Sequence, residues 1–212
     1  MTDTPEPASP PCYAQEVAHP ETAVEGPLWR KAQRAALIAA RMAVPAAERA
    51  QVAEAVAEVL EAELAPGPGL VVSLYWPFRG ELDLRPWMAR AQARGAVVAL
   101  PVVEAMGRPL RFRPWWPGCA MERGVWNIPQ PATGTEVVPD VVIAPLVGFD
   151  PDCYRLGYGG GFFDRTLAGL VPRARAIGVG LPLAALRTIH PQGWDVPMDM
   201  IVTGRARVMR RV

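Results

Sequence analysis

A glycine-rich segment between two arginines, residues 155–165, constrains this chain more than any other feature. Four of the five positions from 157 to 161 are glycine, and Tyr158 is the exception. Without Cβ atoms, the backbone N–H groups of such a turn can converge on a bound group. A helix that begins beyond the turn adds partial positive charge, and phosphates bind at such helix ends. The segment therefore predicts a turn that can hold phosphate.

The flanking residues predict a strand, a turn and a short helix in that order. Residues 141–150 form a nearly continuous apolar run, which is typical of a strand buried in a parallel sheet. Residues 166–170 indicate a short helix on the other side of the glycines. Arg155 and Arg165 add fixed positive charge to the turn, and Asp164 offers an oxygen ligand that suits magnesium.

A purely structural turn is the alternative reading of the glycines. Glycine-rich turns between a strand and a helix also let the helix pack closely on the sheet. The segment lacks the Lys-Ser/Thr pair of the GxxxxGK[ST] phosphate loop, and it is not a GxGxxG turn followed by an acidic residue about twenty positions later. The residues of the turn alone leave both readings open.

Strands and helices alternate along most of the chain. Apolar runs predict strands over 70–76, 96–103, 110–113, 137–149, 176–180, 199–203 and from 207 onward. Helical patterns predict helices over 29–41, 46–64 and 85–94. The alternation predicts a single-domain, Rossmann-like α/β fold, a doubly wound and mainly parallel sheet with helices on both faces. The proline-rich residues 1–26 predict a mobile or loosely docked tail before a domain of residues 27–212.

Bulk properties argue against several classes of protein. A formal net charge of +1 speaks against general nucleic-acid binding. No apolar run approaches the length of about eighteen residues that a membrane span needs. Three widely spaced cysteines favour a reducing compartment over a disulfide or zinc scaffold. The first residues lack the pattern of a signal peptide, so we expect a cytoplasmic protein.

The basic residues carry a sharper signal. Lys31 is the only lysine among 22 basic residues, and all the others are arginine. A compact ammonium on a flexible stem suits a phosphate contact, so the one retained lysine predicts such a contact. Chance retention on an exposed helix face is the alternative.

The remaining chemistry favours phosphoryl transfer over hydrolysis. The chain has two serines, two histidines and no GxSxG turn, and Cys153 has no histidine near it in sequence, so it is interpreted as a packed thiol. The arginines and the single lysine stand beside four candidate carboxylates, Glu81, Asp164, Asp195 and Asp199. Such a set can position a phosphoryl group and neutralise its charge. Trp126 and Trp194 are expected in the core rather than at a ligand.

Taken together, these segments resemble the 5-formyltetrahydrofolate cyclo-ligases, also called 5,10-methenyltetrahydrofolate synthetases. The resemblance runs from about Trp29 to Thr203 and is carried by ordered blocks at 31–34, 80–83, 99–103, 126–131, 148–165 and 194–199. It implies closure of 5-formyltetrahydrofolate to 5,10-methenyltetrahydrofolate with ATP and Mg²⁺, releasing ADP and phosphate. In that reaction the formyl oxygen attacks the γ-phosphate, N10 adds to the activated carbon, and phosphate leaves.

The resemblance also implies roles for individual residues. Catalytic roles fall on Lys31, Arg155 and Tyr158. Substrate contacts fall on Trp76, Glu81, Tyr158 and Phe163, and magnesium on Asp164 and Asp195; from its own surroundings Asp195 would be a turn carboxylate before Pro197. ATP contacts fall on Arg30, Lys31, Arg34, Arg155, Leu156, Gly157, Tyr158, Gly159, Gly160, Gly161, Phe162 and Phe163.

The chain departs from the common family pattern at Phe163, where tyrosine is usual, and at Ala184, Gln192 and Gly204. These departures motivate an alternative, a paralogue that binds folate or nucleotide without efficient turnover. A sugar-phosphate isomerase or transferase is a third reading, but the chain offers it no convincing Glu/His acid–base pair. The expected partner is 5-formyltetrahydrofolate, with or without a polyglutamate tail. We expect no nucleic-acid or membrane partner, and a monomer or a weak homodimer.

Overall fold

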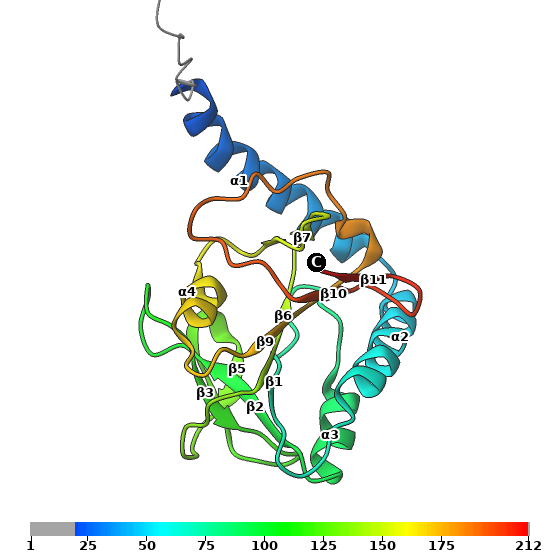
Figure 1. Cartoon of the computed structure of the whole chain (residues 1–212). Coiled ribbons are helices and arrows are strands. Elements are labelled where there is room, and N and C mark those ends of the chain that lie inside the picture. Colours follow the sequence, from blue (N-terminus) through cyan, green and yellow to red (C-terminus); the bar gives the residue numbers. More distant parts are fainter. Residues whose placement is uncertain (1–19, 212) are drawn as a thin grey trace, which may run out of the picture.

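A seven-stranded mixed sheet forms the centre of the computed structural model, which describes residues 20–211 (Figure 1). Its strands in chain order are β1 (Val71–Ser73), β2 (Val97–Val102), β3 (Arg111–Pro114), β6 (Val141–Pro145), β9 (Arg175–Val179), β10 (Met200–Val202) and β11 (Val208–Arg210). Across the sheet the order is β11-β10-β9-β6-β1-β2-β3. The five central strands run parallel, while β3 and β11 are antiparallel at the two edges. The mainly parallel sheet predicted from the sequence is confirmed.

Helices cover the sheet and join its strands. They are α1 (Pro20–Ala43), α2 (Ala46–Leu64), α3 (Arg85–Ala93) and α4 (Phe162–Gly169), with short 3₁₀ turns η1 (Val125–Asn127) and η2 (Pro182–Ala184). Two small antiparallel pairs lie outside the main sheet, one formed by β4 (Met121–Arg123) and β5 (Pro129–Pro131), the other by β7 (Gly148–Phe149) and β8 (Arg155–Leu156). In Figure 1, α2 and α3 lie on one side of the sheet and α4 on the other, while α1 crosses one end and projects beyond the body.

The two layers follow from the period of two residues in a strand. Along β6, Val141 and Ile143 join a core cluster that includes α2 and α3, whereas Val142 and Ala144 join a second cluster that includes α4. A strand buried on both faces must be apolar at every position, which is why residues 141–144 show no alternation. The predicted placement of helices on both faces is therefore confirmed.

The largest differences from the predicted boundaries are in three places. Helix α1 begins at Pro20, earlier than position 29, and residues 1–19 of the proposed tail lie outside the described residues. The expected strand at 137–149 is wrong in extent, because β6 ends at Pro145 and the chain turns into the β7–β8 hairpin. The glycine turn therefore follows the hairpin strand β8 instead of a strand of the main sheet, and α4 already begins at Phe162.

The strand order reverses direction between β1 and β6. From β1 the chain crosses through α3 to β2 on one side, and from β6 it passes through α4 to β9 on the other side. In open α/β sheets, ligands bind in the crevice beyond the carboxyl ends of the strands at such a switch point. The topology thus predicts a site formed by the segments that follow β1 and β6.

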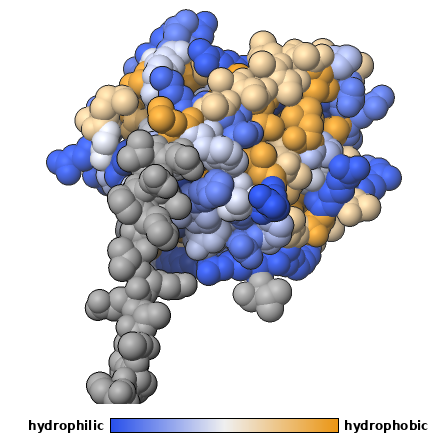
Figure 2. Space-filling model, turned by 90° about the horizontal axis from the view of Figure 1, so that it is seen from above, coloured by the Kyte–Doolittle hydropathy of each residue, from blue (hydrophilic) through white to orange (hydrophobic). Residues whose placement is uncertain are grey.

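The surface is mixed in character. The face in Figure 2 shows hydrophilic residues around a band of hydrophobic ones. None of the helices within residues 20–211 combines the length and apolarity needed to cross a bilayer.

Candidate functional site

A cavity of about 700 Å³ opens at the switch point of the sheet. Four segments enclose most of it: residues 75–81 after β1, residues 125–130 around η1, the glycine turn with the start of α4, and one face of α1. The loop carrying Gln192, Trp194 and Asp195 completes the wall. The volume lies in the range of about 300–1,000 Å³ that is usual for small-molecule sites.

The glycine turn presents backbone to this cavity. Gly159 and Gly161 adopt left-handed conformations, with φ of +97° and +61°, which side chains other than glycine rarely tolerate. Gly161 is the residue before the first turn of α4, so the N-terminal end of that helix faces the cavity. Free N–H groups and the partial positive charge at a helix N-terminus favour an anion there. The turn therefore has the geometry of a phosphate-binding segment.

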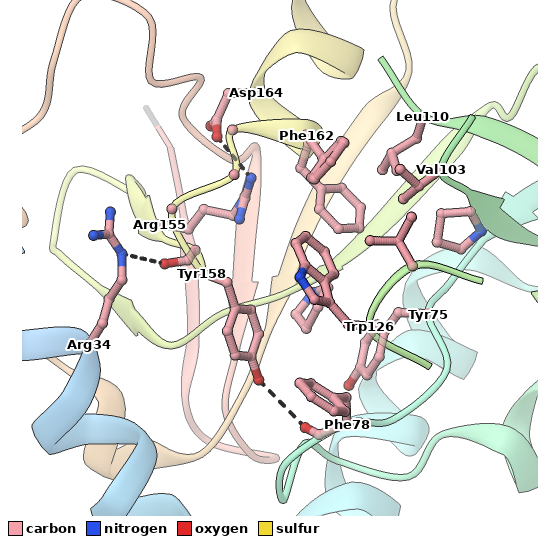
Figure 3. A pocket seen from close by; sticks show the side chains of 18 of the residues that line it. Arg34, Tyr75, Phe78, Val103, Leu110, Trp126, Arg155, Tyr158, Phe162 and Asp164 are labelled. Carbon is pink, nitrogen blue, oxygen red and sulfur yellow. Dashed lines mark hydrogen bonds and ion pairs between the residues drawn. The ribbon is translucent and has the colours of Figure 1, made fainter. Parts of the chain in front are cut away.

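Three arginines, Arg30, Arg34 and Arg155, surround the turn, and Figure 3 shows Arg34 and Arg155. Arg155 donates from Nη2 to Oδ2 of Asp164 at 3.1 Å, and Arg34 donates from Nε to the carbonyl of Gly157 at 2.8 Å. Arg30 makes a two-pronged ion pair with Asp195, with N···O distances of 2.6 and 2.9 Å. Arg30 and Arg34 come from α1 and are four residues apart, so they lie on one face of that helix.

These charges leave a positive surplus. The three guanidinium groups of Arg30, Arg34 and Arg155 face two carboxylates, Asp164 and Asp195. Burial lowers the pKa of Arg155, and burial together with the nearby Arg30 lowers that of Arg34. The Nε atoms of both Arg30 and Arg155 are buried without a hydrogen-bond acceptor. Buried, unpaired donors with excess positive charge are well suited to an anionic ligand.

The carboxylates could bind magnesium only together with oxygen atoms from a bound phosphate and from water. Asp164 accepts from Arg155 and from the amide of Val196 (3.3 Å), the residue next to Asp195, so both carboxylates lie in one part of the cavity. Within residues 20–211, no group of three or more His, Cys, Asp or Glu side chains could enclose a metal ion. Mg²⁺ commonly takes one or two carboxylates and completes its shell with phosphates and water. The donor set fits that mode.

The opposite part of the cavity is aromatic. Tyr75, Trp76 and Phe78 follow β1, and the ring of Trp126 meets that of Phe162 edge-on at 5.7 Å between centroids. Trp126 is 53% exposed and Trp194 is 70% exposed, and both line the cavity. The expectation that these two tryptophans belong to the core is therefore wrong. Flat aromatic walls of this kind suit a planar ring system.

One carboxyl, Glu81, is buried among these aromatic residues. Its Oε2 accepts from the amide of Phe78 at 2.9 Å. Burial raises the pKa of Glu81 to about 7, although the charge of Arg41, the Phe78 amide and the Tyr158 hydroxyl each favour its ionised form. A carboxyl whose pKa is near 7 can either accept or donate a hydrogen bond at neutral pH. This property suits it to the polar edge of a heterocycle.

We expect Glu81 to make the protein less stable as the pH rises. Because its folded pKa of about 7 exceeds the ordinary value of 4.5, the folded state keeps a proton that the unfolded chain has released. Above pH 7 this carboxyl therefore lowers the free energy of unfolding by up to about 3 kcal/mol, and below the pKa that it has in the unfolded chain it has no effect. Glu81→Gln should be more stable than wild type in urea denaturation at about pH 8 and similar at about pH 5. Equal curves for the two proteins at both pH values would contradict the assignment.

The cavity brings most of the predicted site residues together. They include Arg30, Arg34, Trp76, Glu81, Arg155, Gly157, Tyr158, Gly159, Gly160, Gly161, Phe162, Phe163, Asp164 and Asp195. Leu156 is fully buried beside the turn, and Lys31 is exposed on α1 outside the cavity wall. Among the positions at which the chain departs from the common family pattern, Gln192 lines the cavity, whereas Ala184 is packed in the core near β7 and Gly204 lies after β10.

The sequence reasoning missed Arg41, Tyr75 and Phe78. Arg41 lies seven residues after Arg34, which repeats nearly the same helix face, so the spacing of the arginines held a signal. Its side chain is buried and bonds to the hydroxyl of Tyr158. The two aromatic residues belong to a loop whose path no local pattern indicates.

The fold and the site together define an α/β protein with an anion-binding crevice at the switch point of its sheet, next to an aromatic chamber that contains one buried carboxyl. The family model of the 5-formyltetrahydrofolate cyclo-ligases matches residues 28–204. The chain belongs to this family.

Individual relatives agree with the family match. A 5-formyltetrahydrofolate cyclo-ligase from Mycolicibacterium smegmatis is 32% identical over 184 residues, covering 83% of this chain and 94% of the relative. The Escherichia coli K12 protein of the same name is 32% identical over 139 residues, covering 62% and 76%. Among solved structures, the NMR structure of Aquifex aeolicus 5,10-methenyltetrahydrofolate synthetase superposes with a TM-score of 0.72 at 28% identity, covering 85% of this chain and 92% of the other.

Proposed function

We propose that this protein is an enzyme that closes 5-formyltetrahydrofolate to 5,10-methenyltetrahydrofolate at the expense of ATP and with Mg²⁺. One observation carries the proposal: a single cavity combines an arginine-rich glycine turn with an aromatic chamber around Glu81. The first part has the chemistry for a triphosphate and the second for a pterin ring. The family membership of the chain supports the same pairing of substrates.

The site residues would bind the substrates and stabilise the charge that develops in the reaction. Arg155 and the amides of residues 157–161 would hold the phosphates, with Arg30 and Arg34 on the α1 side. When the formyl oxygen attacks the γ-phosphorus and ADP leaves, the transferred group carries negative charge that these donors neutralise. N10 then attacks the activated carbon and loses its proton to phosphate or solvent, the bond from that carbon to the phosphate oxygen breaks, and inorganic phosphate is released.

Asp164 and Asp195 would hold Mg²⁺ together with phosphate oxygens. The ion supplies neutralisation of phosphate charge when it is bound. In the free protein the same carboxylates are engaged by Arg155 and Arg30. These two ion pairs would keep both carboxylates oriented and their charge compensated before nucleotide arrives.

Glu81 and Tyr158 would orient the folate. Glu81 would bond to the polar edge of the pterin, and Trp76 and Phe163 would contact the pterin ring or the adjoining part of the folate. The test is direct: incubation with 5-formyltetrahydrofolate and Mg-ATP should raise the absorbance of methenyltetrahydrofolate in step with the release of phosphate. Folded protein that forms no product above a reaction without ATP would overturn the proposal.

A second candidate is a paralogue that binds folate or nucleotide without efficient turnover. Phe163 favours it, because this ring lies 5.0 Å from the guanidinium of Arg155 and offers no hydroxyl where the family usually has one. Calorimetry that detects folate binding in a protein with no measurable turnover would select this candidate over the enzyme.

The α1 cations provide a graded test of the nucleotide site. Lys31→Ala should raise the KM for ATP by at most about tenfold, because Lys31 lies outside the cavity wall and would contact phosphate only from the surface, and should leave the melting temperature unchanged. Arg30→Met should lower kcat/KM by about 100-fold or more, because Arg30 lines the cavity and holds Asp195. Initial rates over a range of ATP concentrations measure both effects. If Lys31→Ala keeps wild-type kinetics, Lys31 is a surface charge only.

A further inference from the structure

We propose that Arg41 is a positioning residue that ties the nucleotide part of the cavity to the folate part. The inference rests on the proposed function, since it concerns how the two substrates are held relative to one another. Arg41 does not line the main cavity, and its side chain is buried behind the wall of that cavity. Its action must therefore pass through the groups that it holds.

Arg41 bonds to three separate segments. Its Nε donates to the carbonyl of Arg79 at 2.9 Å, in the loop that carries Glu81. One Nη donates to the carbonyl of Leu146 at 3.4 Å, just beyond the end of β6, and the other donates to the hydroxyl of Tyr158 in the glycine turn. A planar guanidinium presents its N–H donors in a rigid fork and so can fix several acceptors relative to one another, whereas the donors of an ammonium rotate freely.

The loop on the folate side packs directly on this arginine. Arg79 and Gly80 both adopt left-handed conformations, with φ of +47° and +74°. A Cβ atom built on Gly80 would lie 3.5 Å from Cγ of Arg41, so the turn sits against the arginine stem. The Tyr158 ring also lies 5.6 Å from the Arg41 guanidinium, and its hydroxyl donates to the carbonyl of Phe78 at 3.5 Å (Figure 3). Tyr158 and residues 78–81 are thus joined both directly and through Arg41.

The same arginine sets the charge around Glu81. Groups on three elements face this carboxyl: Arg41 from α1, Tyr75 after β1, and Tyr158 from the glycine turn. Among them only Arg41 carries a positive charge, and it lowers the pKa of Glu81 against the larger effect of burial. A second cavity of about 10 Å³, lined by Arg41, Tyr75 and Glu81 among others, has room for about one water molecule. Loss of Arg41 would therefore alter both the position and the ionisation of Glu81.

Two variants and a control test the role in turnover. Arg41→Met keeps the length of the stem and removes the bonds and the charge; it should lower kcat by about 100-fold, the loss expected from a small misplacement of reacting groups. In the pH profile of Arg41→Met activity, the pH at which Glu81 ionises should be higher than in wild type. Arg41→Lys should restore the pH profile in part and leave kcat low. The control Arg175→Met removes a half-buried ion pair with Glu63 outside the cavity and should leave both kcat and the profile unchanged.

Hydrogen–deuterium exchange of the free protein supplies a readout that needs no activity. In Arg41→Met, peptides that cover 77–84 and 155–162 should both exchange faster than in wild type and in the control. Wild-type kinetics in Arg41→Met, or exchange that is unchanged in either segment, would overturn the inference. A uniform loss of activity with an unshifted pH profile would also overturn it, because that result indicates a structural role only. If wild type lacks turnover, the proposed function fails, while the exchange experiment still tests whether Arg41 holds the two segments together.

Discussion

Replacing Arg155 with methionine is expected to lower turnover by about 1000-fold, the largest loss that we expect at any single position. Arg155 is 4% exposed, lines the cavity and faces Asp164 from the start of the glycine turn. It is the one cation that would touch phosphate from within the turn, so its loss removes charge neutralisation at the point where negative charge develops. Single-turnover rates with 5-formyltetrahydrofolate and Mg-ATP measure this effect.

The same change should destabilise the fold. Removing one partner of a buried ion pair leaves an uncompensated charge and costs about 3–5 kcal/mol. Asp164 would then be a partly buried carboxylate whose remaining described bond comes from the amide of Val196. The double variant Arg155→Met/Asp164→Asn should recover much of the stability in urea denaturation and none of the turnover. If stability and turnover recovered together, the role of Arg155 would be structural.

The sequence predicted the sheet well because burial leaves a mark at every residue of a central strand. Residues 141–144 are apolar throughout, since one face packs toward α2 and α3 and the other toward α4. The same uniformity hid the end of β6: Pro145, Leu146 and Val147 are also apolar, so the turn into the β7–β8 hairpin left no break in the pattern. Hydropathy reports burial and does not report a change of direction.

The site was predictable as a set of residues and only partly as an arrangement. The glycines and Arg155 are local in sequence, and their chemistry indicated either a phosphate site or a purely structural turn. The pair formed by Arg30 and Asp195 joins residues 165 positions apart, and no sequence pattern encodes that contact. Arg30 and Lys31 were both predicted to contact phosphate, with Lys31 also in a catalytic role, yet neighbouring helix positions point about 100° apart, and of these two only Arg30 lines the cavity. Arg41 was missed because its partners are set by how α1 docks.

A single methyl group in the glycine turn should have an effect nearly as large as the loss of a charged group. A Cβ atom built on Gly157 would lie 2.6 Å from Nη1 of Arg155, closer than real contacts allow, so Gly157→Ala must displace either the guanidinium or the turn. Arg155 has little room to move, because it is buried against Asp164 and the ring of Phe163. We expect kcat/KM to fall by about 100-fold, as for other small displacements of catalytic groups.

Gly169 provides the matched control for that displacement. It is the last residue of α4, and a Cβ atom built there meets nothing within 4 Å. Gly169→Ala should keep full activity and should gain up to about 1 kcal/mol of stability, since alanine favours the helix over glycine. Kinetics and thermal denaturation of both variants separate a specific clash from a general intolerance of added methyl groups. If Gly157→Ala matched Gly169→Ala in activity, the glycine at position 157 would serve packing alone, and the position of Arg155 would not limit the reaction.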